Sequence, residues 1–271
     1  MKRLTCACLL SILAVQVYAQ QLGSAPHSKI AAEDVDLVSL DNRGNVFYSD
    51  TKGNVFKLND SGEIVNQYSP LSQGRLHQFD ASFTMLLFLF SADLQQVVLL
   101  DSHLAPLHYI SFQDEGIGIV RAAALGNNHT LWLFDEADLS LKKYDYRRRE
   151  VLQVQPLGSL LGGDQIQIID IQERQNLVFI NIKERGLFVF DNQANLIKKH
   201  QVHLRENLAV LNDHVYFMAD GHIHQLNIYS EERRMLPLLD VLGDKVAISP
   251  QRMVVYSTCS LFFLPAPIFA R

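Results

Sequence analysis

The segment from Asn45 to Tyr68 reads NVFYSDTKGNVFKLNDSGEIVNQY and decides the fold. Three short runs of strand-forming residues, 45–48, 54–58 and 63–68, are separated by two turn-forming groups, DTKG and NDSG. Asn, Asp and Gly favour the tight turns that join antiparallel strands. The segment therefore predicts a three-stranded antiparallel meander.

The same pattern returns along the chain. A polar residue closes the third predicted strand of each unit, at Asp60, Asp101, Asp145, Asp191 and Asn227, in steps of 41, 44, 46 and 36 residues. Each unit has a second strand before this marker, one strand after it and one more ahead of the pair. Because internal similarity at a fixed period indicates a repeat architecture, the chain predicts six units of four strands.

Repeats of about forty residues with four antiparallel strands are typical of a β-propeller, in which each repeat forms one blade. We therefore expect an all-β, six-bladed β-propeller with four antiparallel strands in each blade. The last unit is one strand short, because Pro265 and Pro267 remove two backbone donors where its fourth strand should begin. We predict that residues 28–32 supply this outer strand and close the ring. A two-sheet sandwich would accommodate the strands but not the sixfold spacing.

The segment Gly44–Asn59, GNVFYSDTKGNVFKLN, combines a glycine, a strand, a turn, a second strand and a polar end. In this order of features it resembles the six-bladed propellers of the NHL-type and TolB-like repeat group. The resemblance covers one unit closely and the other units by pattern. It therefore implies the fold and not a particular activity.

The first 19 residues have the features of a signal peptide. Lys2 and Arg3 precede a short apolar run, and Val17-Tyr18-Ala19 fits a cleavage site. We expect a signal peptide at 1–19, a single propeller domain at 20–271, and a periplasmic or extracellular location. An uncleaved membrane anchor is the alternative, although the apolar run is short for a membrane span. Only Cys259 remains after cleavage, and we expect a buried strand thiol there.

The charge balance argues against nucleic acid as a partner. The whole chain has a formal net charge of −5, and removal of Lys2 and Arg3 with the signal peptide makes it −7. Proteins that bind nucleic acid through its phosphates instead present a basic surface.

Acidic residues gather in the predicted loops between second and third strands, which share one face of a propeller. We expect this face to bind a partner, and its candidate residues are Asp50, Asp93, Asp135, Glu136, Asp138, Glu184 and Asp220. Turns also attract Asp for conformational reasons, so solvated charge is the simpler interpretation of the same residues.

A calcium site at the mouth of the central channel is the alternative to protein binding. Its candidate ligands by position are Asp80, Asp164, Asp170 and Asn212, because carboxylate and amide oxygens suit Ca²⁺. Such a site would make the protein a metal-dependent hydrolase or lactonase. Otherwise we expect no cofactor, and the sequence contains no G-x-S-x-G motif for a catalytic serine. Glycan recognition through Trp132 is a third hypothesis, although a second-strand position predicts a core residue.

The leading functional hypothesis is an exported, non-catalytic β-propeller that acts as a protein-binding platform. Its partner would be a protein of a bacterial cell-envelope complex, in the periplasm or at the outer membrane. The expected signal peptide, the repeat and the lack of a catalytic motif in the sequence together support this interpretation. The propeller itself is expected to have no transmembrane span, because its richest apolar run, Met85–Phe90, is too short to cross a bilayer as a helix.

Overall fold

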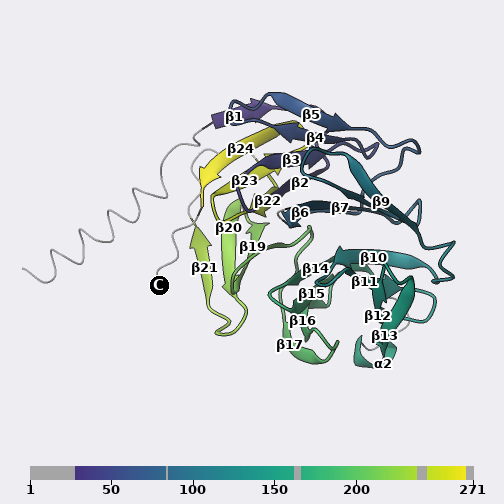
Figure 1. Ribbon diagram of the computed structural model, residues 1–271. Coiled ribbons are helices and arrows are strands. Elements are labelled where there is room, and N and C mark those ends of the chain that lie inside the picture. The colour runs from purple at the N-terminus through teal and green to yellow at the C-terminus, as the bar shows by residue number, and fades with distance from the viewer. Residues whose placement is uncertain (1–27, 84, 162–165, 237–242, 267–271) are drawn as a thin grey trace, which may run out of the picture.

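The computed structural model describes residues 28–83, 85–161, 166–236 and 243–266. These residues form six antiparallel sheets of four strands each, which stand around a central axis (Figure 1). The all-β, six-bladed propeller expected from the sequence is therefore confirmed. The signal peptide and cleavage site expected within residues 1–19 lie outside the described residues.

The strands follow one another blade by blade from the inside of the ring to its rim. Blade 1 holds β2 (Leu37–Leu40), β3 (Val46–Ser49), β4 (Val55–Leu58) and β5 (Ile64–Tyr68), and blade 2 holds β6 (Gln78–Phe83), β7 (Leu86–Ser91), β8 (Gln96–Leu100) and β9 (Pro106–Ser111). Blade 3 holds β10 (Val120–Leu125), β11 (Thr130–Asp135), β12 (Ser140–Asp145) and β13 (Glu150–Pro156), followed by the short helix α2 (Gly158–Leu161). Blade 4 holds β14 (Ile168–Arg174), β15 (Leu177–Ile182), β16 (Gly186–Asp191) and β17 (Leu196–His200). Blade 5 holds β18 (Ala209–Leu211), β19 (His214–Ala219), β20 (His222–Asn227) and β21 (Arg233–Leu236).

Blade 6 is completed by the N-terminal strand, as the sequence predicts. It holds β22 (Lys245–Ile248), β23 (Arg252–Ser257) and β24 (Ser260–Pro265), and β1 (Ser28–Ala31) pairs antiparallel with β24 as the outer strand. In this register Ile30 lies opposite Leu261. The two ends of the chain thus share one sheet, which closes the ring.

The hydrophobic core is divided among the six junctions between neighbouring blades. Each junction has its own cluster of buried side chains, drawn from the two blades that meet there. Phe90 of blade 2 and Leu131 of blade 3 belong to one such cluster, and Trp132 of blade 3 packs with Phe188 of blade 4 in the next. Because each blade packs on both faces, strands such as β7 and β11 are apolar at consecutive positions. Trp132 is fully buried, as expected of a core residue.

Carboxylate and amide side chains fix the turn after the third strand. In blades 2 and 4, Asp101 and Asp191 each accept backbone N–H groups two and four residues further on. In blade 1 the equivalent residue is Asn59, whose Oδ1 accepts the N–H groups of Ser61 and Glu63 at 3.0 and 2.9 Å. The marker chosen from the sequence, Asp60, is therefore wrong by one position.

Cys259 also differs from the expectation. It is exposed in the turn between β23 and β24 rather than buried in a strand, because the strands end at Ser257 and resume at Ser260. Among the described residues, no helix combines the length and apolar character that a membrane span requires.

Gly186, at the start of β16 in blade 4, is expected to tolerate substitution poorly. It has φ +106°, and a Cβ there would overlap the carbonyl oxygen of His200. Gly186→Ala should lower the free energy of unfolding by about 2–4 kcal/mol, from backbone strain and steric overlap together. Gly221→Ala is the control, because Gly221 has φ +73° with open space around it and should lose only about 1 kcal/mol. Equal losses in urea unfolding would contradict the steric part of this prediction.

Candidate functional site

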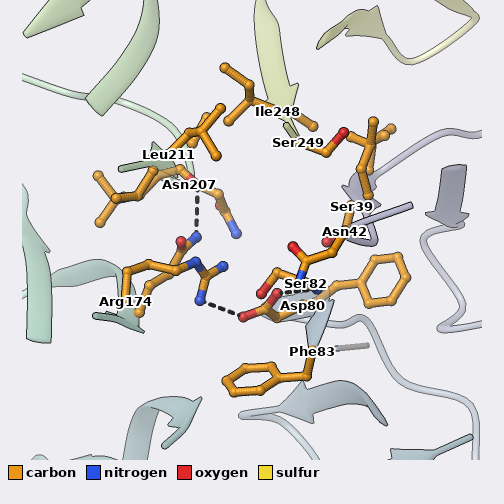
Figure 2. Close-up of a pocket in the computed structure, with 18 of the residues that line it drawn as sticks. Ser39, Asn42, Asp80, Ser82, Phe83, Arg174, Asn207, Leu211, Ile248 and Ser249 are labelled. Carbon is orange, nitrogen blue, oxygen red and sulfur yellow. Dashed lines mark hydrogen bonds and ion pairs between the residues drawn. The ribbon is translucent and has the colours of Figure 1, made fainter. Parts of the chain in front are cut away.

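The central channel contains a cavity of about 480 Å³ (Figure 2). The inner strands of five blades (β2, β6, β14, β18 and β22) line it, and Asn127, just after β10, represents the remaining blade. One wall is apolar, with Leu211 and Ile248, and the facing wall is polar, with Asp80 and Arg174. A cavity of this size and composition can admit a small polar molecule.

Two of the three charged side chains in the lining of this cavity, Asp80 and Arg174, form an ion pair. Arg174 Nη1 lies 2.9 Å from Asp80 Oδ2, and Asp80 Oδ1 accepts the backbone N–H of Ser82 at 2.9 Å (Figure 2). Both side chains are largely buried. The ion pair joins blade 2 to blade 4 across the channel, so the Asp80 carboxylate already has a cationic partner.

Asp170 lies buried on β14 and is held by four donors. Its Oδ1 accepts the Ile171 N–H at 2.9 Å and the Gln78 Nε2 at 3.2 Å, and its Oδ2 accepts the Leu208 N–H at 2.7 Å and the Gln172 Nε2 at 2.9 Å. Burial raises the pKa of Asp170 to about 6, although the four donors favour the ionised form.

Gln78 extends this network to another blade. While its Nε2 donates to Asp170, its Oε1 accepts the backbone N–H of Ala123 on β10 at 2.6 Å. Through Leu208 the network also reaches the segment before β18. One buried carboxylate therefore links the inner strands of blades 2, 3 and 4 to blade 5.

Three of the four calcium candidates fall among the described residues, in two different settings. Asp80 and Asn212 line the channel cavity, Asp170 is buried within the hydrogen-bond network, and Asp164 lies outside the described residues. Within the described part of the chain, no group of three or more His, Cys, Asp or Glu side chains is placed to hold a metal ion.

A second cavity, of about 850 Å³, opens among the loops at the other ends of the inner strands. Its lining combines both signs of charge: Arg121, Glu136, Lys183, Glu184 and Arg185. Arg121 Nε and Glu136 Oε2 are 2.7 Å apart. This cavity is therefore mixed in charge, on the face where the sequence predicts an excess of acidic residues.

Of the seven acidic candidates, four accept hydrogen bonds through their carboxylates from other groups of the protein. Asp50 caps its own turn, Asp135 accepts the N–H groups of Gly118 and Ile119, and Asp135 and Asp138 both contact Lys142, at 2.5 and 2.9 Å. Glu136 pairs with Arg121. The other three, Asp93, Glu184 and Asp220, are exposed and stand on three different blades, and Asp93 Oδ1 lies 3.8 Å from His77 Nε2.

The outer strands of the six blades differ in charge, a feature that the prediction from loop residues did not include. The outermost strands of blades 4, 5 and 6 carry basic side chains, which are Lys198 and Lys199 on β17, Arg233 and Arg234 on β21, and Lys29 on β1. Those of blades 1, 2 and 3 carry no Lys or Arg, and Glu150 is their one acidic residue. The sequence contains this signal, because the fourth strand of each unit can be read directly.

We call the outer surface of β5, β9 and β13 the neutral rim. Its exposed apolar side chains are Ile64, Val65, Leu107, Tyr109, Val151, Leu152 and Val154, each between 42% and 55% exposed. An edge strand presents unpaired N–H and C=O groups, and lysine is a common device that keeps other chains from pairing with it. Each of these strands has a register shift near its start, but β17 has one too. The missing charge therefore distinguishes the two halves of the perimeter.

The protein is thus a six-bladed β-propeller. Polar groups in its channel bond to one another, and the neutral rim exposes apolar side chains without Lys or Arg. No protein-family model and no curated protein matches the chain. Similar solved structures include the propeller of Cps50 (Swd1) from Myceliophteria thermophila, with a TM-score of 0.61 and 9% identity over 90% of this chain and 99% of that one. BamB from Moraxella catarrhalis has a TM-score of 0.51 and 13% identity over 84% of each chain. Virginiamycin B lyase from Staphylococcus aureus has a TM-score of 0.55 and 8% identity over 86% of this chain and 80% of that one. At these identities the likeness concerns the fold, which agrees with the resemblance found in Gly44–Asn59.

Proposed function

We propose that this protein is an exported, non-catalytic platform that binds another protein through the neutral rim. The observation that carries the proposal is the contrast between the two halves of the perimeter. Basic residues guard the outer strands of blades 4 to 6, whereas the outer strands of blades 1 to 3 expose apolar side chains and unpaired backbone groups. A partner that covers this half would remove the need for guarding charges.

The bonds inside the channel favour the platform over a calcium-dependent hydrolase or lactonase. The carboxylates of Asp80 and Asp170 are directed to donors of the protein itself. The proposal therefore includes no cofactor. Its setting is a bacterial cell-envelope assembly, periplasmic or at the outer membrane, which rests on the signal peptide expected at residues 1–19. Likeness of fold to BamB, a bacterial protein, is compatible with this setting.

Lysines placed on the neutral rim should abolish capture of the partner. We expect the tagged full-length protein, purified from its own host in mild detergent, to retain one protein in stoichiometric amount. A variant with Ile64→Lys, Leu107→Lys and Val151→Lys should lose that protein, because three charges would have to be desolvated at the interface. Quantitative mass spectrometry of the eluates provides the measurement, with a loss of at least tenfold expected.

The matched control adds lysines to the half that is already basic. Leu196→Lys and Ile197→Lys alter exposed apolar residues of β17 and should leave capture unchanged. If the rim variant still retains the partner, the surface is misassigned. A wild-type protein that elutes alone contradicts the platform itself and directs attention to the channel cavity and a small ligand.

A further inference from the structure

A third cavity lies on the neutral rim where blades 1 and 2 meet. It has a volume of about 320 Å³, and we call it the seam pocket. Tyr68 of β5 and Tyr109 of β9 belong to its lining, together with Leu76, Leu94 and Val98. The pocket therefore interrupts the neutral rim between two of its three strands.

The seam pocket differs from the other two cavities in its chemistry. Its lining, as far as the chain is described, contains no charged side chain, whereas Asp80 and Arg174 line the channel cavity and Arg121 and Glu136 the cavity on the other face. Its lining is mainly aliphatic and aromatic, with a few hydroxyl and amide groups. Such a site favours an uncharged, apolar occupant, since a charged one would lose its hydration without gaining a partner.

Two tyrosines supply part of the polar character of the seam pocket. Their hydroxyl oxygens are 3.5 Å apart. Burial and the hydroxyl of Tyr109 raise the pKa of Tyr68, so its phenol stays neutral at physiological pH. At this separation the two hydroxyls bond weakly to each other, so either could also bond a peptide group next to an inserted side chain.

The loops around the seam pocket are held in place by their backbones. Gly74 donates its N–H to the carbonyl of Lys52 at 3.2 Å, and Gly53 donates to Asp50 at 3.2 Å. A Cβ on Gly53 would overlap the Gly74 carbonyl, so the two loops approach as closely as glycine permits. The side chain of Leu71, in the second loop, is fully exposed. The pocket is thus formed before any partner arrives, with an apolar residue displayed beside it.

We propose that the seam pocket receives one large apolar side chain from a partner protein whose extended segment lies along the neutral rim. This inference rests on the proposed function and names the energetic centre of that interface. Binding energy at protein interfaces concentrates in a few apolar anchors that fill fitted pockets, with aromatic residues prominent among them. We assign an apolar side chain of a protein to this pocket because the pocket lining is uncharged and the pocket is continuous with the neutral rim.

The variants that test this proposal alter exposed positions, so that folding is preserved. Tyr109→Ala removes one wall of the seam pocket, and Leu71→Asp places a charge beside it. Tyr109 is 55% exposed and Leu71 fully exposed. Tyr229→Ala is the matched control, because Tyr229 is 61% exposed on blade 5 and lies away from the neutral rim.

Small amides serve as probes for the inserted side chain. Saturation-transfer NMR of the full-length protein with N-acetyl-L-tryptophanamide and N-acetyl-L-leucinamide should give saturable binding in the millimolar range, typical of a single anchor. N-acetyl-L-glutamate amide should bind at least tenfold more weakly. Tyr109→Ala and Leu71→Asp should each weaken the apolar probes at least fivefold, and Tyr229→Ala should leave them unchanged. Equal binding of the charged probe, or full binding by both pocket variants, overturns the proposal.

The captured partner separates failure of this proposal from failure of the proposed function. If Tyr109→Ala and Leu71→Asp each weaken the partner at least tenfold, the seam pocket is its anchor. If the triple lysine variant loses the partner while both pocket variants keep it, the platform stands and the anchor lies elsewhere on the neutral rim. If the triple lysine variant keeps the partner as well, the neutral rim is not the interface.

Discussion

A chain that begins at Ala32, and so lacks β1, is expected to lose about 3–5 kcal/mol of unfolding free energy. It loses the backbone hydrogen bonds between β1 and β24. It also loses the packing of Ile30 against the hydrophobic cluster that contains Leu261 and Phe263. Ile30 also contacts Gly62 in blade 1, so β1 joins the last blade to the first. Since a whole domain is stable by only about 5–15 kcal/mol, the urea midpoint should fall markedly.

Two substitutions distinguish the contribution of side-chain packing by β1 from that of its backbone pairing. Ile30→Asp keeps the backbone of β1 and should reproduce about half of the loss, because a charge replaces a partly buried side chain. Lys29→Gln alters an exposed neighbour on the same strand and should change stability by less than about 1 kcal/mol. A shortened chain that unfolds at the same urea concentration as the full one would show that the ring does not depend on this closure.

Asp170→Ala is expected to destabilise the protein by about 3–5 kcal/mol at neutral pH. The substitution leaves four donors without their acceptor, two of them backbone N–H groups in the interior. Asp191→Ala is the control, because this carboxylate also caps N–H groups but does so in an exposed turn. It should lose about 1 kcal/mol. Similar losses at the two positions in urea unfolding would contradict the structural role assigned to Asp170.

The stability difference between the wild type and Asp170→Asn should depend on pH in a definite direction. The folded protein holds the Asp170 proton with a pKa of about 6, whereas the ordinary pKa of an aspartate side chain is 3.8. The stabilisation due to this raised pKa is fully present below pH 4 and is lost as the pH rises through 6. The wild type should therefore lose, relative to Asp170→Asn, on the order of 2 kcal/mol between pH 4 and pH 7. Parallel stability curves for the two proteins over that range would contradict the raised pKa.

Much of the fold could be predicted because its signals are local. Turn residues in Asn45–Tyr68 define the first meander, and Pro265 and Pro267 stop the last blade before its fourth strand. The closing strand at 28–32 followed from counting strands, and the structure confirms it. The marker at Asp60 was wrong because two polar residues are adjacent there. Only backbone geometry shows that the first of them caps the turn.

The candidate site was less predictable because it depends on long-range pairing. The sequence places Asp80 and Asp170 near inner strands but does not show that Arg174 pairs with the first and Leu208 with the second. Loop acidity also misleads, since Asp135 is buried and binds Lys142. The neutral rim, in contrast, was visible in the composition of the fourth strands. The sequence prediction did not include it because that prediction was based on the charges of the loops.

Synthesis of the chain imposes an order on the closure of the ring. A ribosome releases β1 (Ser28–Ala31) long before its partner β24, which begins only at Ser260. Until that point the first strand has no ladder to join, and the apolar strand Ser260–Pro265 is the last to find its place. A chain that stops anywhere before residue 260 leaves the last blade incomplete and the ring open, however well the other blades have formed. Release of β24 from the ribosome therefore acts as the checkpoint for the native ring, and chains that lack this strand present unpaired sheet edges.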